Sequence, residues 1–457
     1  MLELNKIYLG NNIDILRTFP DNSIDSIVTD PPYGLGKEPN AVEVLQSWIT
    51  TGYHEISGKG FMGKEWDSFV PQPIFWKECY RVLKHGGHLL SFAGTRTYDW
   101  MVMGIRLSGF EIRDQIAWLY GSGFPKSHNI GVAIDKINGV ESKVISNGKS
   151  GKSSHAFQSE EVTTAGEYEI KEAQNEWQGW GTALKPALEP IVMARKPLDG
   201  TVANNVLKHG VGGINIDGCR VETDDDIGAR YDGSFQEGNS QFVSQTATKS
   251  GKRVLIDKPE ANSLGRFPAN VIHDGSDEVV SLFPNTDGSK ASGYNFELSN
   301  NNNTTNILTN IKSGIHYDDN GGSASRFFYT AKSSQNERNF GLGEFDEKYT
   351  ASAEFRPNHM EKALDGESGN PFGRWQPKKN IHPTVKPIDL MRYLVRLVTP
   401  KGGICLDPFM GSGTTAVACK AEKINYVGCE LEPEYVKIAE ARIKAEVVMF
   451  DIFDFGA

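Results

Sequence analysis

Two parts of the chain alternate short apolar runs with helical apolar patterns. In the first part, apolar runs occupy residues 6–9, 24–28 and 88–93. Phe75, Cys79 and Val82 recur at helical spacing, and Gly86 and Gly87 follow them. We therefore expect strands at the three runs and a helix that ends at the glycine pair. Strands that alternate with a helix in this order favour a parallel sheet.

The same alternation returns near the carboxyl end of the chain. Apolar runs occupy 188–194, 404–406 and 425–429, and small residues fill 414–421. Ile388, Met391, Val395 and Val398 are spaced by three or four residues, which is typical of a helix with one apolar face. Another helix is expected to begin at Pro433, because proline suits the first helical turn. This part of the chain is again α/β.

The stretches between these parts are polar and only weakly periodic. Residues 140–180 contain two Gly-Lys-Ser triplets, but neither has the glycine five residues earlier that a phosphate loop requires. We expect a flexible loop there. From 198 to 375, Gly, Asn, Ser and Asp dominate, with four consecutive asparagines at 300–303. The pattern predicts three regions: 1–197, 198–375 and 376–457.

Composition restricts the class of protein. The 457 residues carry a formal charge of −10 and are 38% hydrophobic, which is too apolar for a disordered chain. No apolar run approaches the roughly 18 residues of a membrane span, so no membrane partner is expected. The five cysteines include no C-x-x-C pair and the ten histidines are scattered, which predicts a reducing cytoplasm and no metal. The acidic total argues against a protein that coats nucleic acid.

A glycine motif follows the predicted strand at 404–406. It runs from Asp407 through Gly411 and Gly413 to Ala416, and Glu430 ends the next strand. Glycines let the backbone approach a nucleotide-type ligand, and an acid at the end of the next strand accepts hydrogen bonds from ribose hydroxyls. The spacing also fits an NAD-dependent oxidoreductase or a tight turn without a ligand. The Asp-Pro-Phe sequence before the glycines is unusual for an NAD site.

A second motif, Asp30-Pro31-Pro32-Tyr33, follows the predicted strand at 24–28. The exocyclic amine of a nucleobase is a poor nucleophile, because its lone pair is delocalised into the ring. Asp30 and the carbonyl of Pro31 can accept both amine hydrogens and favour a pyramidal nitrogen, while the prolines fix that carbonyl. Tyr33 offers a face on which an extruded base can stack. Pro-Pro alone could be a plain loop.

Together the two motifs resemble the amino-methyltransferases of DNA, which transfer methyl from S-adenosylmethionine to adenine N6 or cytosine N4. The catalytic motif precedes the cofactor glycines, as in the permuted β group, and 382–387 is similar to the segment that precedes the glycines there. The resemblance implies an α/β, Rossmann-like methyltransferase fold, circularly permuted, with a central loop-rich target-recognition insert. The stretches 265–270 and 321–332 resemble segments of the modification methylases of phages and prophages, and the resemblance implies a bacterial, cytoplasmic enzyme.

The resemblance also assigns the site residues. The catalytic residues are Asp30, Pro31, Pro32 and Tyr33. The cofactor-binding residues are Asn11, Thr384, Lys386, Asp407, Pro408, Phe409, Gly411, Ser412, Gly413, Thr414, Thr415 and Glu430. Residues 404–406, 425–429, 6–9 and 24–28 would supply strands one to four of the methyltransferase sheet, and 188–194 a late strand. Residues 10–12 would then lie near the cofactor's adenine.

Several alternatives stay open. Asp at the first motif position favours adenine N6, whereas Ser would favour cytosine N4. Cytosine C5 chemistry needs a Pro-Cys dipeptide, which the chain lacks. RNA or protein methylation, or a DNA-binding protein with a decayed core, would keep the same fold. The expected partner is double-stranded DNA, and relatives of this group are often homodimers. The range 374–401, with seven basic residues and one acid, suggests a DNA groove, and Arg266, Arg326 and Lys332 are candidate base readers.

Overall fold

The computed structural model describes residues 2–56, 67–123, 127–149, 167–223, 265–287, 321–331, 335–346 and 379–453. It divides the chain into two compact units. The first comprises Met1–Asn215, Asn270–Ser276 and Thr330–Ala457, and the second comprises Ile216–Ala269 and Asp277–Tyr329. The second unit lies within the predicted region 198–375. The asparagines at 300–303, Lys332 and Arg374 lie outside the described residues.

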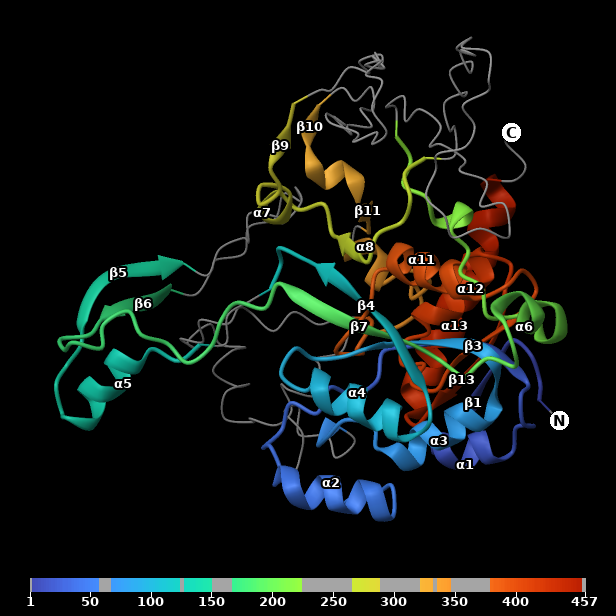
Figure 1. Ribbon diagram of the computed structural model, residues 1–457. Coiled ribbons are helices and arrows are strands. Elements are labelled where there is room, and N and C mark those ends of the chain that lie inside the picture. Colours follow the sequence, from blue (N-terminus) through green and yellow to red (C-terminus); the bar gives the residue numbers. More distant parts are fainter. Residues whose placement is uncertain are drawn as a thin grey trace, which may run out of the picture. The chain divides into compact units, whose positions relative to one another are not determined.

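A nine-stranded sheet forms the centre of the first unit (Figure 1). Its order is β1 (Lys6–Leu9), β13 (Asn425–Glu430), β12 (Ile404–Asp407), β2 (Ile24–Thr29), β3 (Leu83–Phe92), β7 (Leu188–Arg195), β4 (Glu111–Leu119), β8 (Val271–His273) and β11 (Tyr329–Thr330). The first five strands are mutually parallel, and β7 is antiparallel to both of its neighbours. The predicted parallel sheet is confirmed, and strands from both ends of the chain join it.

Helices cover both faces of this sheet (Figure 1). One face carries α1 (Asn12–Arg17), α3 (Pro73–Val82) and α4 (Tyr98–Leu107), with α2 (Ala41–Thr50) beyond them. The other face carries α11 (Ile388–Val398), α12 (Thr414–Ala421) and α13 (Pro433–Phe453). Fully buried Trp76 and Leu89 belong to the core between the first helix layer and the sheet. Across the described residues, no helix is long and apolar enough to cross a bilayer.

The glycine pair after α3 does not end that helix. Helix α3 ends at Val82 and β3 begins at Leu83, so Gly86 and Gly87 lie inside the strand. The pairing of β3 with β2 shifts its register there. A side chain at Gly86 would come within 2.1 Å of the Asn205 amide. The glycines thus mark an irregularity in the strand rather than the predicted helix end.

The predicted loop at 140–180 is wrong at two segments, and its residues 150–166 lie outside the described residues. Strands β5 (Lys143–Lys149) and β6 (Glu167–Glu172) pair as an antiparallel ladder, after α5 (Ile130–Ile137). Lys143 stands opposite Glu172, and opposite charges across a ladder stabilise it. The polar composition hid these strands, and the apolar side chains described in them, Val144, Ile145 and Ile170, are exposed.

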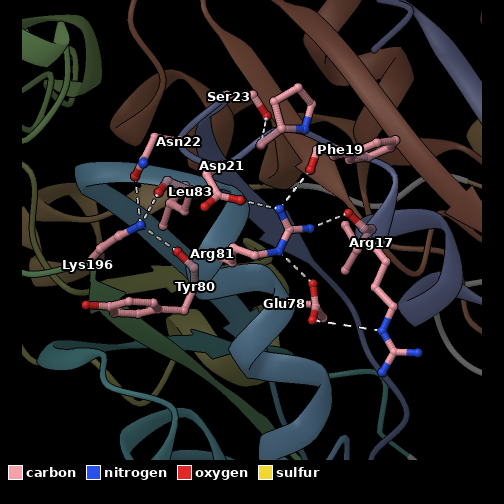
Figure 2. Close-up of polar contacts among 12 residues, drawn as sticks. Arg17, Phe19, Asp21, Asn22, Ser23, Glu78, Tyr80, Arg81, Leu83 and Lys196 are labelled. Atoms are coloured by element: carbon pink, nitrogen blue, oxygen red, sulfur yellow. Dashed lines mark hydrogen bonds and ion pairs between the residues drawn. The ribbon is translucent and has the colours of Figure 1, made fainter. Parts of the chain in front are cut away.

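Two buried or partly buried cations fix the chain that leads into β2 (Figure 2). Arg81 of α3 donates to the carbonyls of Leu16 and Phe19 at the end of α1, and also binds Asp21. Its Nε donates to Glu78. These bonds satisfy carbonyls that the end of α1 leaves without helical partners.

Lys196 is the second of these cations and follows β7 directly. Its Nζ lies 2.8 Å from each of three acceptors, the Asn22 side chain and the carbonyls of Tyr80 and Leu83 (Figure 2). Only 4% of Lys196 is exposed, and burial lowers the pKa of its ammonium. The start of β2, the end of α3 and the end of β7 are therefore tied together.

The second unit is built from short elements. They are η2 (Asp217–Cys219), α7 (Asp277–Val280), β9 (Asn285–Thr286), β10 (Gly322–Ser323) and η3 (Ala324–Phe327). Arg266 and Arg326 each lie 4.3 Å from the centre of the Phe327 ring. Arg326 also donates to the carbonyls of Gly322 and Ser323. Both candidate base readers therefore pack against their own unit. The first unit also contains α6 (Val202–His209) and α8 (Gln335–Arg338).

Candidate active site

A cavity of about 670 Å³ opens at the carboxyl ends of β1, β2, β12 and β13, within the first unit. It is lined by both sequence motifs and by the 382–386 segment. Of the sixteen predicted site residues, fifteen line it. Gly413 is the exception and instead precedes α12, where a Cβ would come within 2.7 Å of Ala439. Parallel strands deliver ligand-binding loops to this edge of a sheet, so two motifs almost 380 residues apart meet in one cavity.

The Asp30-Pro31-Pro32-Tyr33 motif forms one wall. Strand β2 ends at Thr29, and Asp30 follows directly. The Tyr33 hydroxyl lies 2.9 Å from Asp30 Oδ1 and 2.9 Å from Glu189 Oε2, so it is shared between two carboxylates. Burial, with the two carboxylates beside it, raises the pKa of Tyr33 well above its usual range. Tyr33 therefore stays a neutral donor that holds Asp30 in place.

Lys386 contacts the Asp30-Pro31-Pro32-Tyr33 motif. Its Nζ lies 2.7 Å from Asp30 Oδ2 and 3.2 Å from Glu189 Oε2. Burial lowers the pKa of Lys386, but the two carboxylates raise it more, and the net shift is upward. The ammonium also lies 4.8 Å from the centre of the Phe92 ring. Lys386 lines the cavity as predicted, but its polar contacts are with the two carboxylates of Asp30 and Glu189.

Asp407 lies at the end of β12, the strand that neighbours β2 in the sheet. It accepts hydrogen bonds from the hydroxyl of Thr29, at 2.6 Å, and from that of Thr415. The backbone N–H of Phe409 also donates to it, at 3.0 Å. Burial raises the pKa of Asp407 to about 6, although these three bonds lower it. Asp407 links β12 to β2 and holds the turn into α12.

Glu430 shapes the glycine loop from the end of β13. One of its oxygens accepts the backbone N–H of Gly411 at 2.7 Å, and the other accepts that of Glu432 at 2.8 Å. Burial raises the pKa of Glu430 even though these bonds lower it. Gly411 has a φ of +53°, and a Cβ there would lie 2.6 Å from His382 Nε2. Only glycine fits this turn without moving the histidine.

The 382–386 segment packs over the glycine loop. His382 donates from Nδ1 to the carbonyl of Thr384 and packs edge-on against the ring of Tyr435. Burial lowers the pKa of His382 to about 4, so its ring is neutral at physiological pH. This neutral ring packs directly against the glycine turn at Gly411.

Residues 10–12 contact the glycine motif and the end of β13, where the Gly10 N–H donates to the Glu430 carbonyl at 2.8 Å. The side chain of Asn11 caps α1 by accepting from the N–H groups of Ile13 and Asp14. The Asn12 amide donates to the carbonyl of Pro408 at 3.2 Å. Both asparagines line the cavity. Asn11 thus has a structural task besides its predicted place beside the cofactor.

Sequence reasoning missed two residues that organise the site. Glu189 lies on β7 and binds Tyr33 and Lys386. Arg442 on α13 is fully buried and donates to Ser412 and Thr414 in the glycine loop. A charged residue in an otherwise apolar strand or helix face is the signal that marks both of them. The basic range 374–401 can also offer DNA less positive charge than expected, because Arg392 and Arg396 both form ion pairs with Glu422.

A family model and the curated relatives of this chain all point to the same family. The family model described as DNA methylase matches residues 24–210 and 214–441. The type II methyltransferase M.HindIII of Haemophilus influenzae is 27% identical over 231 residues, which are 46% of this chain and 64% of that protein. The type II methyltransferase M.BglI of Bacillus subtilis is 42% identical over 67 residues, 15% of this chain and 19% of that protein. The chain thus matches less than two thirds of these relatives' length.

Solved structures align over most of the chain at low similarity. The PvuII DNA methyltransferase (cytosine-N4-specific) gives a TM-score of 0.39 at 13% identity, and the match covers 98% of this chain and 91% of that chain. The M1.HpyAVI–SAM complex gives a TM-score of 0.35 at 13% identity, and covers 96% and 98% respectively.

Proposed function

Because the chain belongs to the DNA methylase family, we propose that it transfers a methyl group from S-adenosylmethionine to adenine N6 at specific sites in double-stranded DNA. One observation carries this proposal. The Asp30-Pro31-Pro32-Tyr33 motif and the Asp407 glycine loop line the same cavity of about 670 Å³. An amine-holding motif and a nucleotide-type loop are the two parts that this reaction has to bring together.

S-adenosylmethionine is the cofactor of this family, and the residues present fit it. The cofactor carries a sulfonium and an amino group, both cationic, and two ribose hydroxyls. Asp407 and Glu430 line the cavity with carboxylates that suit these groups. Gly411 lines the cavity with bare backbone, and a Cβ there would lie 2.6 Å from His382 Nε2, so only glycine lets this turn pack so closely.

The residues of the catalytic wall position the target amine. When bound, the cofactor supplies an electrophilic methyl group. Asp30 and the Pro31 carbonyl accept the two amine hydrogens, which turns the nitrogen lone pair toward that methyl. The lone pair forms the new N–C bond, the S–C bonding pair stays with sulfur, and one amine proton then leaves toward Asp30. Tyr33 stacks on the extruded base, and the protein contributes positioning and electrostatics.

Three finer points are part of the proposal. Asp30 at the first motif position supports adenine over cytosine N4. The sheet order, in which β12 and β13 come from the end of the chain and lie between β1 and β2, supports the permuted β group. The second unit lies within the region expected to read the target sequence, and its Arg220 lies 5.7 Å from the centre of the half-exposed Phe267 ring, a type of pair that binds nucleic acid.

Incubation with tritiated S-adenosylmethionine and unmethylated DNA tests the proposal. Label in acid-insoluble DNA is the expected result. Cofactor binding without transfer to any DNA would instead indicate a DNA-binding protein with a decayed core. Binding of NAD without S-adenosylmethionine would indicate an oxidoreductase and would overturn the proposal.

A further inference from the structure

The catalytic wall contains three charged groups in direct contact. Lys386 Nζ lies 2.7 Å from Asp30 and 3.2 Å from Glu189, and the side chains of these residues are 8%, 18% and 20% exposed. The Tyr33 hydroxyl bridges the same two carboxylates. Two acids and one base leave the cluster with a net charge of −1. Asp30 alone with Lys386 would be a neutral pair.

This balance matters for the reaction proposed above. Positive charge develops on the amine nitrogen as the methyl group arrives, and a net negative wall stabilises it. An ammonium 2.7 Å from Asp30 opposes that effect, and it opposes it more strongly in a site shielded from water. A second carboxylate on the same ammonium restores the negative charge. Glu189 is that carboxylate.

The position of Glu189 suits a fixed support. It lies in β7, opposite Trp118 of β4 and within a strand paired on both sides. Within the described part of the chain, its polar contacts to the site are with Tyr33 of the motif and with Lys386. A residue held by the central sheet can fix the positions of two side chains of the site without touching the base itself.

We propose that Glu189 is a positioning residue for methyl transfer, which offsets the charge of Lys386 and holds Tyr33 so that Asp30 stays an effective acceptor. This inference rests on the proposed function. It predicts that Glu189 affects turnover far more than cofactor binding, because its contacts are with the catalytic wall.

The Glu189→Gln variant tests it, with Glu111→Gln as the matched control. Glu111 lies on neighbouring β4 and binds Arg195 at 2.7 Å, away from the cavity. With full-length protein, E189Q is expected to lower kcat for DNA methylation at least tenfold. The dissociation constant for S-adenosylmethionine should stay within twofold, and E111Q should change neither quantity.

The double variant E189Q/K386M separates charge balance from a merely structural role. Losing both the acid and the base returns the wall to a charge of −1. We expect its kcat to exceed that of E189Q several-fold, whereas independent structural damage would add up and lower it further. Transfer by wild type with an unchanged E189Q kcat, or a double variant worse than E189Q, would overturn the inference alone. Absence of transfer by wild-type protein would overturn the proposed function and the inference together.

Discussion

Arg442 donates to the glycine loop, and under the proposed function its removal should weaken the binding of S-adenosylmethionine. Its NH1 lies 2.7 Å from the Ser412 carbonyl and 3.0 Å from the Thr414 hydroxyl. Arg442→Met keeps much of the side-chain volume but leaves buried acceptors without this donor, at a cost of about 1–3 kcal/mol. We expect a roughly tenfold rise in the dissociation constant for S-adenosylmethionine, measured by calorimetry.

Arg220→Met in the second unit is the control, because Arg220 binds Asp217 there and does not line the cavity. Equal cofactor affinity in wild-type protein and Arg442→Met would show that the loop keeps its shape without the arginine.

The raised pKa of Asp407 predicts that the stability of the folded protein depends on pH. Its pKa is raised from 3.8 to about 6 in the folded protein, mainly by burial. The folded state therefore holds this proton more tightly than the unfolded state. Its contribution to stability is full below the unfolded pKa and is lost as pH rises through about 6.

Asp407→Asn removes that proton site. The Tm of wild type relative to Asp407→Asn should fall as pH rises from about 4 to about 7 in paired thermal unfolding scans. A Tm difference that stays constant, or that grows with pH, would contradict the assignment of this carboxyl.

At the residue scale, the sequence was enough to predict the position of side chains that belong to a local motif. Asp30 and Asp407 each end an apolar strand and precede proline, so each could be assigned to the edge of a sheet. Glu189 could not be assigned a role in the same way. Its task depends on Tyr33 and Lys386, which lie 156 and 197 residues away in sequence. Pairings of this kind are set by the tertiary fold.

At the scale of elements, Lys196 ties three segments together and should be costly to remove. Lys196→Met leaves the carbonyls of Tyr80 and Leu83 and the Asn22 side chain without their buried donor. We expect a loss of about 2–4 kcal/mol in the free energy of unfolding, measured in urea.

Lys208→Met is the matched control, since the Lys208 side chain is 64% exposed in its ion pair with Asp199. It should cost less than about 0.5 kcal/mol, as surface pairs usually do. Similar losses in the two variants would mean that the buried contacts of Lys196 do not stabilise the junction.

Elements with a buried face were predictable, and elements without one were not. The helix at 388–398 and the strands at 6–9 and 404–407 follow their apolar patterns closely. In the β5–β6 ladder the described apolar side chains Val144, Ile145 and Ile170 are exposed, so its polar sequence looked like that of a loop. Gly86 and Gly87 led to a predicted helix end where the structure has a strand, because a helix end and an irregular strand both favour glycine.

At the scale of the whole molecule, the charge of −10 and the basic range 374–401 need a different interpretation. In the described part of that range, Lys386 is buried against carboxylates, and Arg392 and Arg396 share Glu422. These contacts reduce the positive charge that the range can offer to phosphates. We therefore expect this range to attract DNA less strongly than its sequence suggests.

The double variant Arg392→Gln/Arg396→Gln tests this interpretation through the salt dependence of DNA binding. Each lost phosphate contact lowers the slope of log affinity against log salt by about 0.9. We expect an unchanged slope in fluorescence anisotropy titrations. A slope reduced by roughly 1.8 would show that both arginines contact the DNA backbone.

The central claim is that two distant motifs build one site for methyl transfer to adenine N6. Mass spectrometry of nucleosides from DNA treated with wild-type protein or Asp30→Ala, alongside the cofactor dissociation constant of each, tests it most directly. We expect N6-methyladenine with wild type, none with Asp30→Ala, and cofactor affinity within about threefold, a difference of less than about 0.7 kcal/mol. N4-methylcytosine from wild type, or equal loss of cofactor binding and transfer in Asp30→Ala, would contradict the account.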